Sequence, residues 1–286
     1  MPPKGLKVRM ATLDDVPAIV DVHRTDVFDG NPWLEVPTCA AHLNNFLLDG
    51  HLALVAELKG RVVGEVEFFV ANEAPFGRVA SLNVICVHEE FRRHGVGQAL
   101  MERAFRLSRR ANAQFFHVTP EPKAVPFYRR LGLAPADDLL WVKCPLPTKV
   151  QSVRVTVCDD EPYEPVSGLV QVFGRYISSR HTWWLTSRWC RLTGQSEFRP
   201  RRYRLSVGRR PARLALRQRE RRRVWGYGWL SPEGSPALLF DRLCPLARSE
   251  GGKRLHTLMS RTTYERLARR FPLVPGDPEL LLSKGL

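Results

Sequence analysis

A short run of glycine and basic residues has the composition of an anion-binding turn. It spans 88–98, and within it Arg92, Gly95 and Gly97 keep the spacing Arg-x-x-Gly-x-Gly. Glycines remove the Cβ atoms that would keep an anion away from backbone amides, and Arg92 and Arg93 offer charge-assisted contacts to phosphate oxygens. The run therefore indicates a diphosphate site. An ordinary turn between a strand and a helix is the alternative.

The elements on either side of this turn decide whether its amides can converge on a ligand. Val79 to Val87 is a nearly continuous apolar run, which predicts a strand covered on both faces, at the centre of a sheet. Apolar residues recur at helical spacing from Ala99 to Arg110 and predict a helix. Because a helix N-terminus presents unpaired amides and partial positive charge, the turn is expected to bind an anion there.

The rest of the first half supplies further strands and helices. In chain order the pattern predicts a strand at 8–11, a helix with Thr12 as its N-cap, a helix at 40–48, a hairpin of strands 52–58 and 61–70, and a strand at 115–118. Lys59-Gly60 is the predicted turn of the hairpin.

Two motifs in this order resemble the GNAT superfamily of N-acyltransferases. The turn Arg92-x-x-Gly95-x-Gly97 is similar to the pyrophosphate loop that joins the fourth strand of that family to its third helix. The segment Ala124-Val125-Pro126-Phe127-Tyr128-Arg129-Arg130-Leu131-Gly132-Leu133 is similar to the family's Ala-x-x-Phe-Tyr helix. The resemblance covers about residues 8–145. It implies an α/β (α+β) fold in which helices flank a mixed, mostly antiparallel sheet whose central strands 4 and 5 splay apart.

The resemblance implies an acyl-CoA-dependent N-acyltransferase that moves an acetyl group from acetyl-CoA to a primary amine by direct attack in a ternary complex. Tyr128 would stand beside the thioester and protonate the leaving thiolate as a general acid; a half-buried helix aromatic is the alternative for this residue. The implied cofactor-binding residues are Cys86 and Val87 along the pantetheine arm, with Arg92, Arg93, His94, Gly95, Val96, Gly97 and Gln98 around the pyrophosphate.

A general base is also needed, because a free amine is almost entirely protonated at neutral pH. Glu65 and Glu67 share one face of a predicted strand, and Asn83 on the next strand would orient a water. Ser81 stands where many relatives have a glutamate, so the base stays open among these candidates and a water chain. Glu121 replaces an asparagine that relatives often use on pantetheine, and no cofactor role is assigned to it.

The chain is long enough for two hydrophobic cores, and we expect two tandem domains. Residues 1–147 would form the catalytic domain and 148–286 a degenerate GNAT-like domain, with a linker at about 145–167. Leu52-Ala53-Leu54 recurs as Leu214-Ala215-Leu216 at an offset of 162 residues, and matches further along the chain, at offsets of 155 and 153, pair Gly95 with Glu250 and Tyr128 with Leu281. Neither Glu250 nor Leu281 suits the original role, so no acyl-CoA binding or catalysis is expected in the second half.

The second half is also the basic one. Acidic and basic residues balance in 1–147, so the formal net charge of +15 lies entirely in 148–286 and is densest from Arg199 to Arg223. Solvated strand edges, an anionic partner such as nucleic acid, and steering of coenzyme A are the alternatives. Trp183, Trp184 and Trp189 interleave this charge and would stack on bases or pack in a core.

Composition argues against several other classes of protein. Six cysteines without a close pair fit neither a disulfide framework nor a zinc site, and the histidines show no metal-ligand spacing, so no metal is predicted. No run approaches the roughly 20 apolar residues of a membrane span, and the first residues lack the apolar core of a secretion signal. A cytoplasmic protein without a membrane partner is therefore expected.

The acceptor is expected to be a small-molecule or peptide amine that enters between loops at 26–40 and 71–78, where Trp33 and Phe76 could line the pocket. The oligomeric state stays open between monomer and homodimer. Two other functions remain: a non-catalytic acyl-CoA sensor, and a nucleic-acid-binding protein that uses the basic half.

Overall fold

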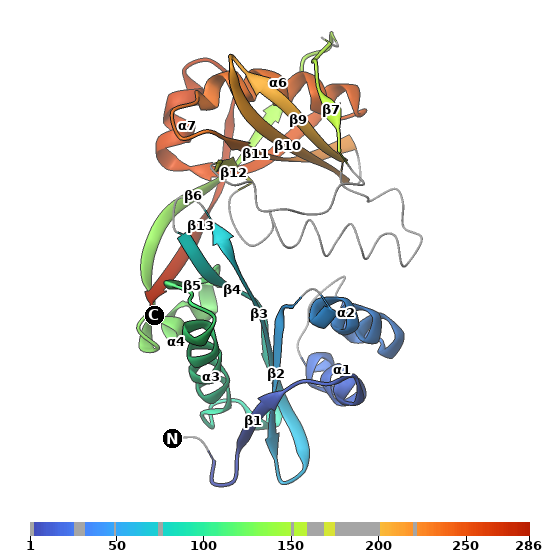
Figure 1. Ribbon diagram of the computed structural model, residues 1–286, viewed down its shortest axis with the longest axis vertical. Helices are drawn as coiled ribbons and strands as arrows, with labels where there is room; N and C mark the ends of the chain where they lie inside the picture. Colours follow the sequence, from blue (N-terminus) through green and yellow to red (C-terminus); the bar gives the residue numbers. More distant parts are fainter. Residues whose placement is uncertain are drawn as a thin grey trace. The chain divides into compact units, whose positions relative to one another are not determined.

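The computed structural model describes residues 3–25, 32–48, 50–73, 77–149, 152–158, 169–174, 201–219 and 222–286 (Figure 1). The chain divides into two compact units. The N-terminal unit comprises residues 1–72, 76–134 and 283–286, and the C-terminal unit comprises residues 73–75 and 135–282. Both have a mixed α/β fold with a mostly antiparallel sheet, as the predicted fold class requires.

The described strands that lie mainly in the N-terminal unit are, in chain order, β1 (Lys7–Met10), β2 (Leu52–Leu58), β3 (Arg61–Glu73), β4 (Gly77–Val87) and β5 (Phe115–Val118). The pairs β1–β2 and β2–β3 are antiparallel, whereas β4 and β5 are parallel. Lys59 and Gly60 join β2 to β3 with positive φ angles of 51° and 79°, as in a tight hairpin turn. The predicted hairpin and central strand are confirmed, as is the strand at 115–118.

Helices cover both faces of these strands. In Figure 1 the α1 and α2 helices lie on one side of the sheet and α3 and α4 on the other. The helix α3 turns one apolar stripe inward, including Leu100, Met101 and Ala104, because these residues recur at helical spacing. The helical segments are η1 (Leu13–Asp15), α1 (Val16–Arg24), η2 (Pro32–Leu34), α2 (Val36–Leu48), η3 (Glu89–Phe91), α3 (Val96–Arg110), η4 (Pro122–Ala124) and α4 (Val125–Arg130).

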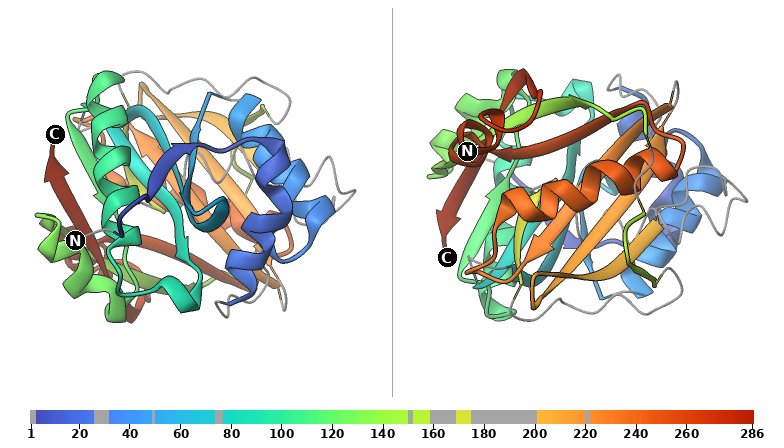
Figure 2. Two further views of the ribbon diagram at one scale, coloured as in Figure 1. Left: turned by 90° about the horizontal axis from the view of Figure 1, so that it is seen from below. Right: turned by 90° about the horizontal axis from the view of Figure 1, so that it is seen from above.

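The C-terminal unit packs the helix α6 across its strands, as the right panel of Figure 2 shows. Its elements are β6 (Ala134–Pro145), β7 (Thr156–Val157), β8 (Val170–Phe173), β9 (Arg201–Val207), β10 (Arg210–Arg219), β11 (Arg223–Leu230), α6 (Pro236–Ser249), β12 (Arg254–Ser260), α7 (Arg261–Ala268) and β13 (Val274–Gly285). The strands follow the order β13-β6-β12-β11-β10-β9-β7, and β8 pairs with β11 outside this path. Leu239, Phe240 and Leu243 of α6 are fully buried in the core that they form with β10 and β11.

The last strand of the first half does not stay in the N-terminal unit. β6 pairs with β12 along Leu139 to Pro145, and the compact N-terminal unit ends at Ala134. In exchange, residues 283–286 at the end of β13 belong to the N-terminal unit, where the Leu286 amide donates to the Gln114 carbonyl at 3.0 Å. The boundary at 147 stays a prediction of where the two halves of the sequence meet.

Apart from β8, the described strands and helices from β7 onward follow the same order as those of the N-terminal unit from β1 onward. The antiparallel pair β7–β9 corresponds to β1–β2, and the parallel pair β11–β12, joined through α6, corresponds to β4–β5 joined through α3. This order corrects the repeat register expected from the sequence. Glu250 follows the end of α6 and Leu281 lies on β13, so they are not the counterparts of Gly95 and Tyr128. The expected register was wrong because the short Leu-Ala-Leu match aligned β2 with β10. The strand that corresponds to β2 in the structure is β9, one strand earlier in the chain.

Other expectations are tested only in part. Cys39, Cys86, Cys144, Cys158 and Cys244 are buried thiols, and Cys190 lies outside the described residues. Within the ranges described above, no helix is both long and apolar enough to cross a membrane. Trp183, Trp184 and Trp189 also lie outside the described residues, as do 150–151 and 159–167 of the expected linker.

Candidate functional site

The turn between β4 and α3 has the backbone that its glycine pattern predicts. Gly95 is the N-cap of α3 with φ 80° and ψ 0°, a left-handed conformation in which glycine is not strained. Arg93 also has a positive φ, of 67°. The helix begins at Val96 and runs for 15 residues, so the amides of its first turn are presented at the end of the central strand.

Arg92 ties this turn to the elements on either side of it. Its Nε donates to the Val87 carbonyl at 2.9 Å, and one Nη donates to the Thr25 carbonyl, after α1, at 3.1 Å. Arg93 and His94 are exposed in the turn, and the Gln98 amide donates to Glu102 at 2.9 Å on the surface of α3. Arg92 therefore shapes the turn, while its predicted contact with phosphate, like those of Arg93, His94 and Gln98, stays a prediction.

The central strands part soon after they meet. β4 pairs with β5 only from Val79 to Ser81, although β4 continues to Val87. Residues 82–87, here named the β4 edge, therefore run on toward the turn without β5 beside them. Cys86 and Val87, the residues predicted to line the pantetheine arm, end this edge. Among the described strands, only β3 and β5 pair with β4.

Gly97 keeps open the space between the turn and α4. A Cβ at this position would lie 3.4 Å from Cζ of Phe127 and 3.7 Å from Cγ2 of Val87. Only a very small side chain would fit there without filling the space in front of the first amides of α3. The residues present thus fit an extended, anionic ligand that reaches the helix start from the β4 edge.

Tyr128 lies on α4, which follows β5, and is only 4% exposed. Its ring packs edge-on against Phe127, with ring centroids 5.0 Å apart. Burial, together with the charge of Glu121, raises the pKa of Tyr128 above its ordinary value. The phenol therefore keeps its proton at neutral pH and can act as a hydrogen-bond donor.

Glu67 is the centre of a buried hydrogen-bond cluster on the α1–α2 side of the sheet. Its carboxylate accepts hydrogen bonds from Trp33 Nε1 at 3.1 Å, His42 Nε2 at 2.9 Å and Asn83 Nδ2 at 2.7 Å. Burial alone would raise the pKa of Glu67, but His42 and the other donors outweigh it and the pKa lies below its ordinary value. The charge of Glu67 raises the pKa of His42 despite burial. Glu67 is therefore ionised, and its oxygens are occupied.

Glu65, two residues away on the same face of β3, has the opposite character. It is fully buried, and its Oε2 lies 2.6 Å from Nε2 of His23 on α1. Burial and then the charge of Glu67 raise the pKa of Glu65 well above its ordinary value. A protonated Glu65 donating to a neutral His23 satisfies this contact without a second buried charge.

The structure brings together some predicted site residues but not all. Glu67 and Asn83 are in direct contact, and Trp33 joins them. Tyr128 lies on α4, which is on the opposite side of the sheet from α1 and α2 (Figure 1). His23 and His42 were not predicted. Their only sequence signal is a histidine among apolar neighbours on a helix, and their partners lie 42 and 25 residues away in the chain.

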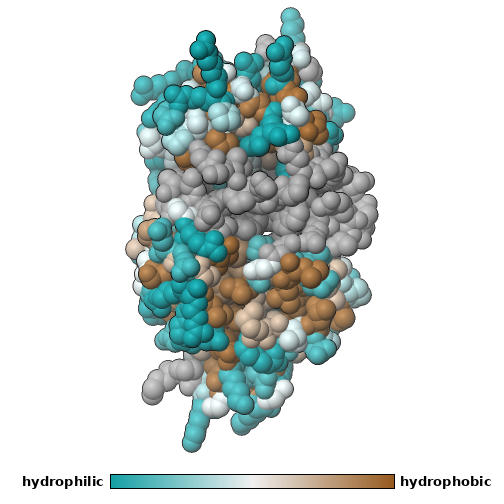
Figure 3. Space-filling model, in the orientation of Figure 1, coloured by the Kyte–Doolittle hydropathy of each residue, from teal (hydrophilic) through white to brown (hydrophobic). Residues whose placement is uncertain are grey.

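Several expected features lie at the limits of the described structure. Residues 26–31 and 74–76, which include Phe76, are outside the described residues. The loops expected at 26–40 and 71–78 are shorter than predicted, because η2 and the start of α2 take up 32–34 and 36–40, and β3 and β4 take up 71–73 and 77–78. Exposed apolar side chains, Leu13, Val36 and Leu48, belong to the helical segments on the α1–α2 side, where Figure 3 shows hydrophobic residues at the surface. Among the described residues, no group of three or more His, Cys, Asp or Glu side chains is arranged to hold a metal ion.

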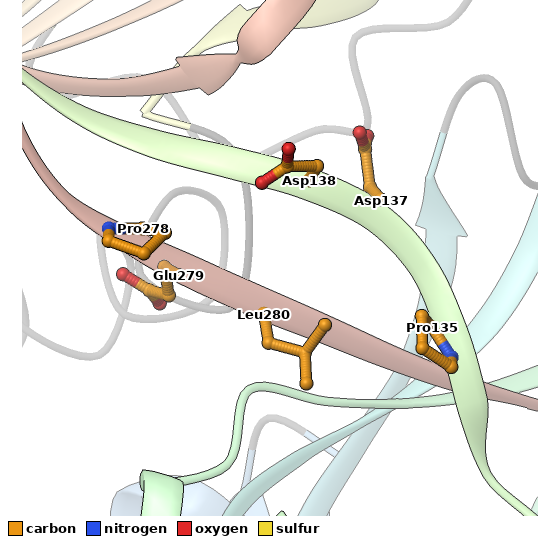
Figure 4. Close-up of a pocket in the computed structure, with 6 residues that line it drawn as sticks. All are labelled: Pro135, Asp137, Asp138, Pro278, Glu279 and Leu280. Atoms are coloured by element: carbon orange, nitrogen blue, oxygen red, sulfur yellow. The ribbon is translucent and has the colours of Figure 1, made fainter.

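A separate pocket of about 420 Å³ lies in the C-terminal unit between β6 and β13 (Figure 4). It is lined by Pro135, Asp137, Asp138, Pro278, Glu279 and Leu280. Three carboxyl groups make this lining unsuitable for phosphates, and none of the predicted site residues contributes to it. The candidate site is therefore the region of β3, β4, α3 and α4 in the N-terminal unit.

Comparison with known proteins identifies similar folds and one family match. A crystal structure of a candidate acetyltransferase from Pyrococcus horikoshii is similar to this chain with 12% identity and a TM-score of 0.61, over 100% of this chain and 91% of that chain. A GCN5-related N-acetyltransferase from Kribbella flavida has 14% identity and a TM-score of 0.61, over 98% of this chain and 71% of that chain. A GCN5-related N-acetyltransferase from Anabaena variabilis has 12% identity and a TM-score of 0.60, over 98% of this chain and 72% of that chain. At such identities the similarity shows the fold alone. No curated protein matches the sequence. The profile of the acetyltransferase (GNAT) family matches residues 18–133, the segment that contains the turn, the buried cluster and Tyr128. The similarity of this chain to the acetyltransferase (GNAT) family therefore covers residues 18–133.

Proposed function

We propose that the protein is an acyl-CoA-dependent N-acyltransferase that moves an acetyl group from acetyl-CoA to the primary amine of a small molecule or peptide. The observation that carries the proposal is the β4 edge. It is a stretch of central strand that β5 leaves uncovered and that leads directly to the left-handed Gly95 and the start of α3. Such an edge can pair with an extended amide-containing arm, and the helix start suits its diphosphate.

Tyr128 supplies the proton in this proposal. The amine nitrogen attacks the thioester carbonyl, the new C–N bond forms, the C–S bond breaks, and the thiolate takes the phenol proton of Tyr128. The attacking nitrogen loses its own proton to solvent, and solvent reprotonates Tyr128. The raised pKa keeps Tyr128 protonated before the reaction, so it is available as an acid at neutral pH.

Asn83 would orient the attacking amine. A carboxylate can only accept hydrogen bonds, so the Asn83 amide nitrogen must face Glu67 and its Oδ1 is left to accept from another donor. Asn83 lies two residues beyond Ser81, the last β4 residue paired with β5. Glu67 acts in this proposal as the residue that holds Asn83 in place, since its oxygens already accept three side-chain donors. The protonated Glu65 is unsuited to remove a proton.

Two substitutions at Gly97 test cofactor binding. In calorimetry with acetyl-CoA, we expect Gly97→Glu to weaken binding at least about tenfold, about 1.4 kcal/mol, because a carboxylate enters the space in front of the helix amides. Gly97→Ala is the matched control, since its Cβ makes only ordinary contacts with Phe127 and Val87. Equal affinity of wild type and Gly97→Glu would refute the site.

Tyr128→Phe tests the acid. The change removes one hydroxyl from a side chain that is otherwise buried. We expect acetyl-CoA affinity to be retained and turnover on an amine library, followed by release of the coenzyme thiol, to fall about 10²–10⁴-fold. Unchanged turnover would remove Tyr128 from the mechanism, and binding without any wild-type turnover would favour a sensor.

A further inference from the structure

The C-terminal unit has a strand edge equivalent to the one proposed to bind acyl-CoA. β11 pairs with β12 from Arg223 to Trp225 only, although β11 continues to Leu230. Residues 226–230, here named the β11 edge, are thus not paired with β12, just as the β4 edge is not paired with β5. In each unit the parting strands are joined through one helix, α6 or α3.

A segment of the chain itself lies on the β11 edge. β8 pairs with it in antiparallel fashion, with Val170 opposite Leu230 and Phe173 opposite Gly228. β8 also reaches the other side of the gap, because the amide of the next residue, Gly174, donates to the Leu258 carbonyl of β12 at 2.7 Å. One short strand therefore bonds to both of the strands that part.

Side chains at the point of divergence complete this arrangement. Thr257 of β12 donates from its hydroxyl to the Gly226 carbonyl of β11 at 2.8 Å and accepts from the Gly174 amide at 3.0 Å. The Gln171 amide group donates to the carbonyls of Phe173 at 3.2 Å and Gly174 at 2.7 Å. The polar groups at this end of β8 are thus satisfied within the unit, as a buried strand requires.

Packing fixes β8 in place. Phe173 is 0% exposed, and its ring centroid lies 5.2 Å from that of Phe240 on α6. Gly228 makes room for it, since a Cβ there would lie 2.8 Å from Cδ2 of Phe173. Gly174 has φ 65°, and a Cβ on it would meet the ring of Tyr227 at 2.1 Å. These contacts make β8 part of the core, and the two glycines are needed for its path.

The helix start beside this edge also differs from that of α3. Residues 231–235, which connect β11 to α6, are Ser-Pro-Glu-Gly-Ser. They lack arginines like Arg92 and Arg93 in the turn before α3. Pro236 removes one amide from the first turn of α6, and Ser235 caps the helix with its side chain accepting from the Leu238 amide. In contrast, Tyr264 lies on α7 four residues after Ser260, as Tyr128 lies on α4 four residues after Ala124. The phenol is retained while the binding edge is not available.

We propose that β8 is a permanent internal occupant of the edge that would otherwise receive an acyl-CoA arm in the C-terminal unit, so that each chain takes one acyl-CoA, in the N-terminal unit. The number of bound cofactors rests on the proposed function. The occupation of the β11 edge by β8 does not, and it is tested separately.

Hydrogen exchange on the full chain tests the occupation directly. Without ligand, amides of 170–174 should exchange at least about 100-fold more slowly than an unstructured peptide, and added acetyl-CoA should slow exchange at 82–97 but leave 170–174 and 226–236 unchanged. Fast exchange of 170–174, or new protection of 226–236 with acetyl-CoA, would overturn the proposal. Calorimetry should give one site per chain in the wild type, and in Gly97→Glu the affinity of that one site should fall at least about tenfold. A second site in the wild type, or an unchanged affinity in Gly97→Glu, would also overturn it.

Gly228→Ala provides a matched structural test. Its Cβ pushes against Phe173, so exchange at 170–174 should rise about tenfold or more while the single acetyl-CoA site remains. Gly285→Ala is the control, because a Cβ there would meet nothing within 4 Å. Equal exchange at 170–174 in the two variants would refute the locking role of Phe173. A wild type that binds no acetyl-CoA would refute the proposed function, and the exchange of 170–174 would still decide whether β8 occupies the edge.

Discussion

The two buried glutamates of β3 should respond in opposite ways to the same substitution. Glu65 and Glu67 are both 0% exposed, lie two residues apart on one face, and each contacts a histidine. Glutamine keeps the shape of the side chain and removes its charge. Glu67→Gln and Glu65→Gln therefore form a matched pair that differs only in whether an ionised group is lost.

The magnitude follows from the contacts. Glu67→Gln takes the negative charge away from His42 and turns an N–H toward at least one of the donors Trp33, His42 and Asn83. Breaking a buried ion pair from one side costs about 3–5 kcal/mol. Glu65→Gln only replaces a donating hydroxyl by a donating amide beside His23, and we expect a change within about 1 kcal/mol at pH 7.

Hydrogen exchange of the β2–β4 peptides at pH 7 is the appropriate assay, because two units need not unfold in one step. A loss of about 3–5 kcal/mol corresponds to exchange that is about 150- to 4000-fold faster in Glu67→Gln. The β12 peptides of the C-terminal unit serve as an internal control. Equal losses in the two variants, or a larger loss in Glu65→Gln, would show that the assignment of the charge to Glu67 is wrong.

Three further predictions follow from the same contacts. The folded-state pKa values of Glu65 and His42 are raised, so the stability that each residue contributes is complete below its unfolded pKa and is lost as the pH rises through its folded pKa. In urea unfolding from pH 6 to 9, the free energy of unfolding of the N-terminal unit should therefore fall by up to about 1.4 kcal/mol per pH unit for each group, and less steeply in Glu65→Gln. Parallel curves for the wild type and Glu65→Gln would contradict this. Asn83→Ala should raise the acceptor KM about tenfold, the value of one good hydrogen bond, while acetyl-CoA affinity stays constant in calorimetry; an unchanged KM would exclude Asn83 from acceptor binding. Deleting residues 283–286 removes the Leu286–Gln114 hydrogen bond and the contact of the Lys284 ammonium with the Leu131 carbonyl. The free energy of opening that protects the β5 and α4 peptides from exchange should therefore fall by about 1–3 kcal/mol. Unchanged exchange in these peptides would show that residues 283–286 do not stabilise the unit.

Local patterns were sufficient for the parts of the site that are close in sequence. The turn from His88 to Gln98 could be predicted because a buried strand, two glycines and an amphipathic helix follow one another directly. The alternation of Glu65 and Glu67 on β3 likewise placed both on one face. What the alternation could not reveal is their different ionisation, since this depends on His42 and Asn83 from other elements.

Long-range pairing was the part that could not be predicted. The sequence of β6 has no feature that selects β12 rather than β5 as its neighbour in the sheet. The passage of the chain from the N-terminal to the C-terminal unit after Ala134 therefore has no local signal in the sequence. The position of β8 is similar, because its four residues give no sign that they lie beside β11. The wrong register of the repeat has the same origin. A match of three residues in the sequence cannot show whether β9 or β10 corresponds to β2. In the structure, the parallel pair β11–β12 corresponds to the parallel pair β4–β5, and the other strands can then be assigned from their order.

The two faces of the repeated sheet support the proposal that chemistry is confined to the N-terminal unit. On β3, Gly64 faces α3, since a Cβ there would lie 3.2 Å from Leu100, so Glu65 and Glu67 face α1 and α2. On the corresponding strand β10, Leu214 and Leu216 pack in the core with α6, so the equivalent face belongs to Arg213, Ala215 and Arg217. Arginines cannot accept the hydrogen bond that Glu67 takes from Asn83. Removing β8 would therefore uncover an edge without the carboxylate that positions an acceptor, and the retained Tyr264 would have no amine to act on.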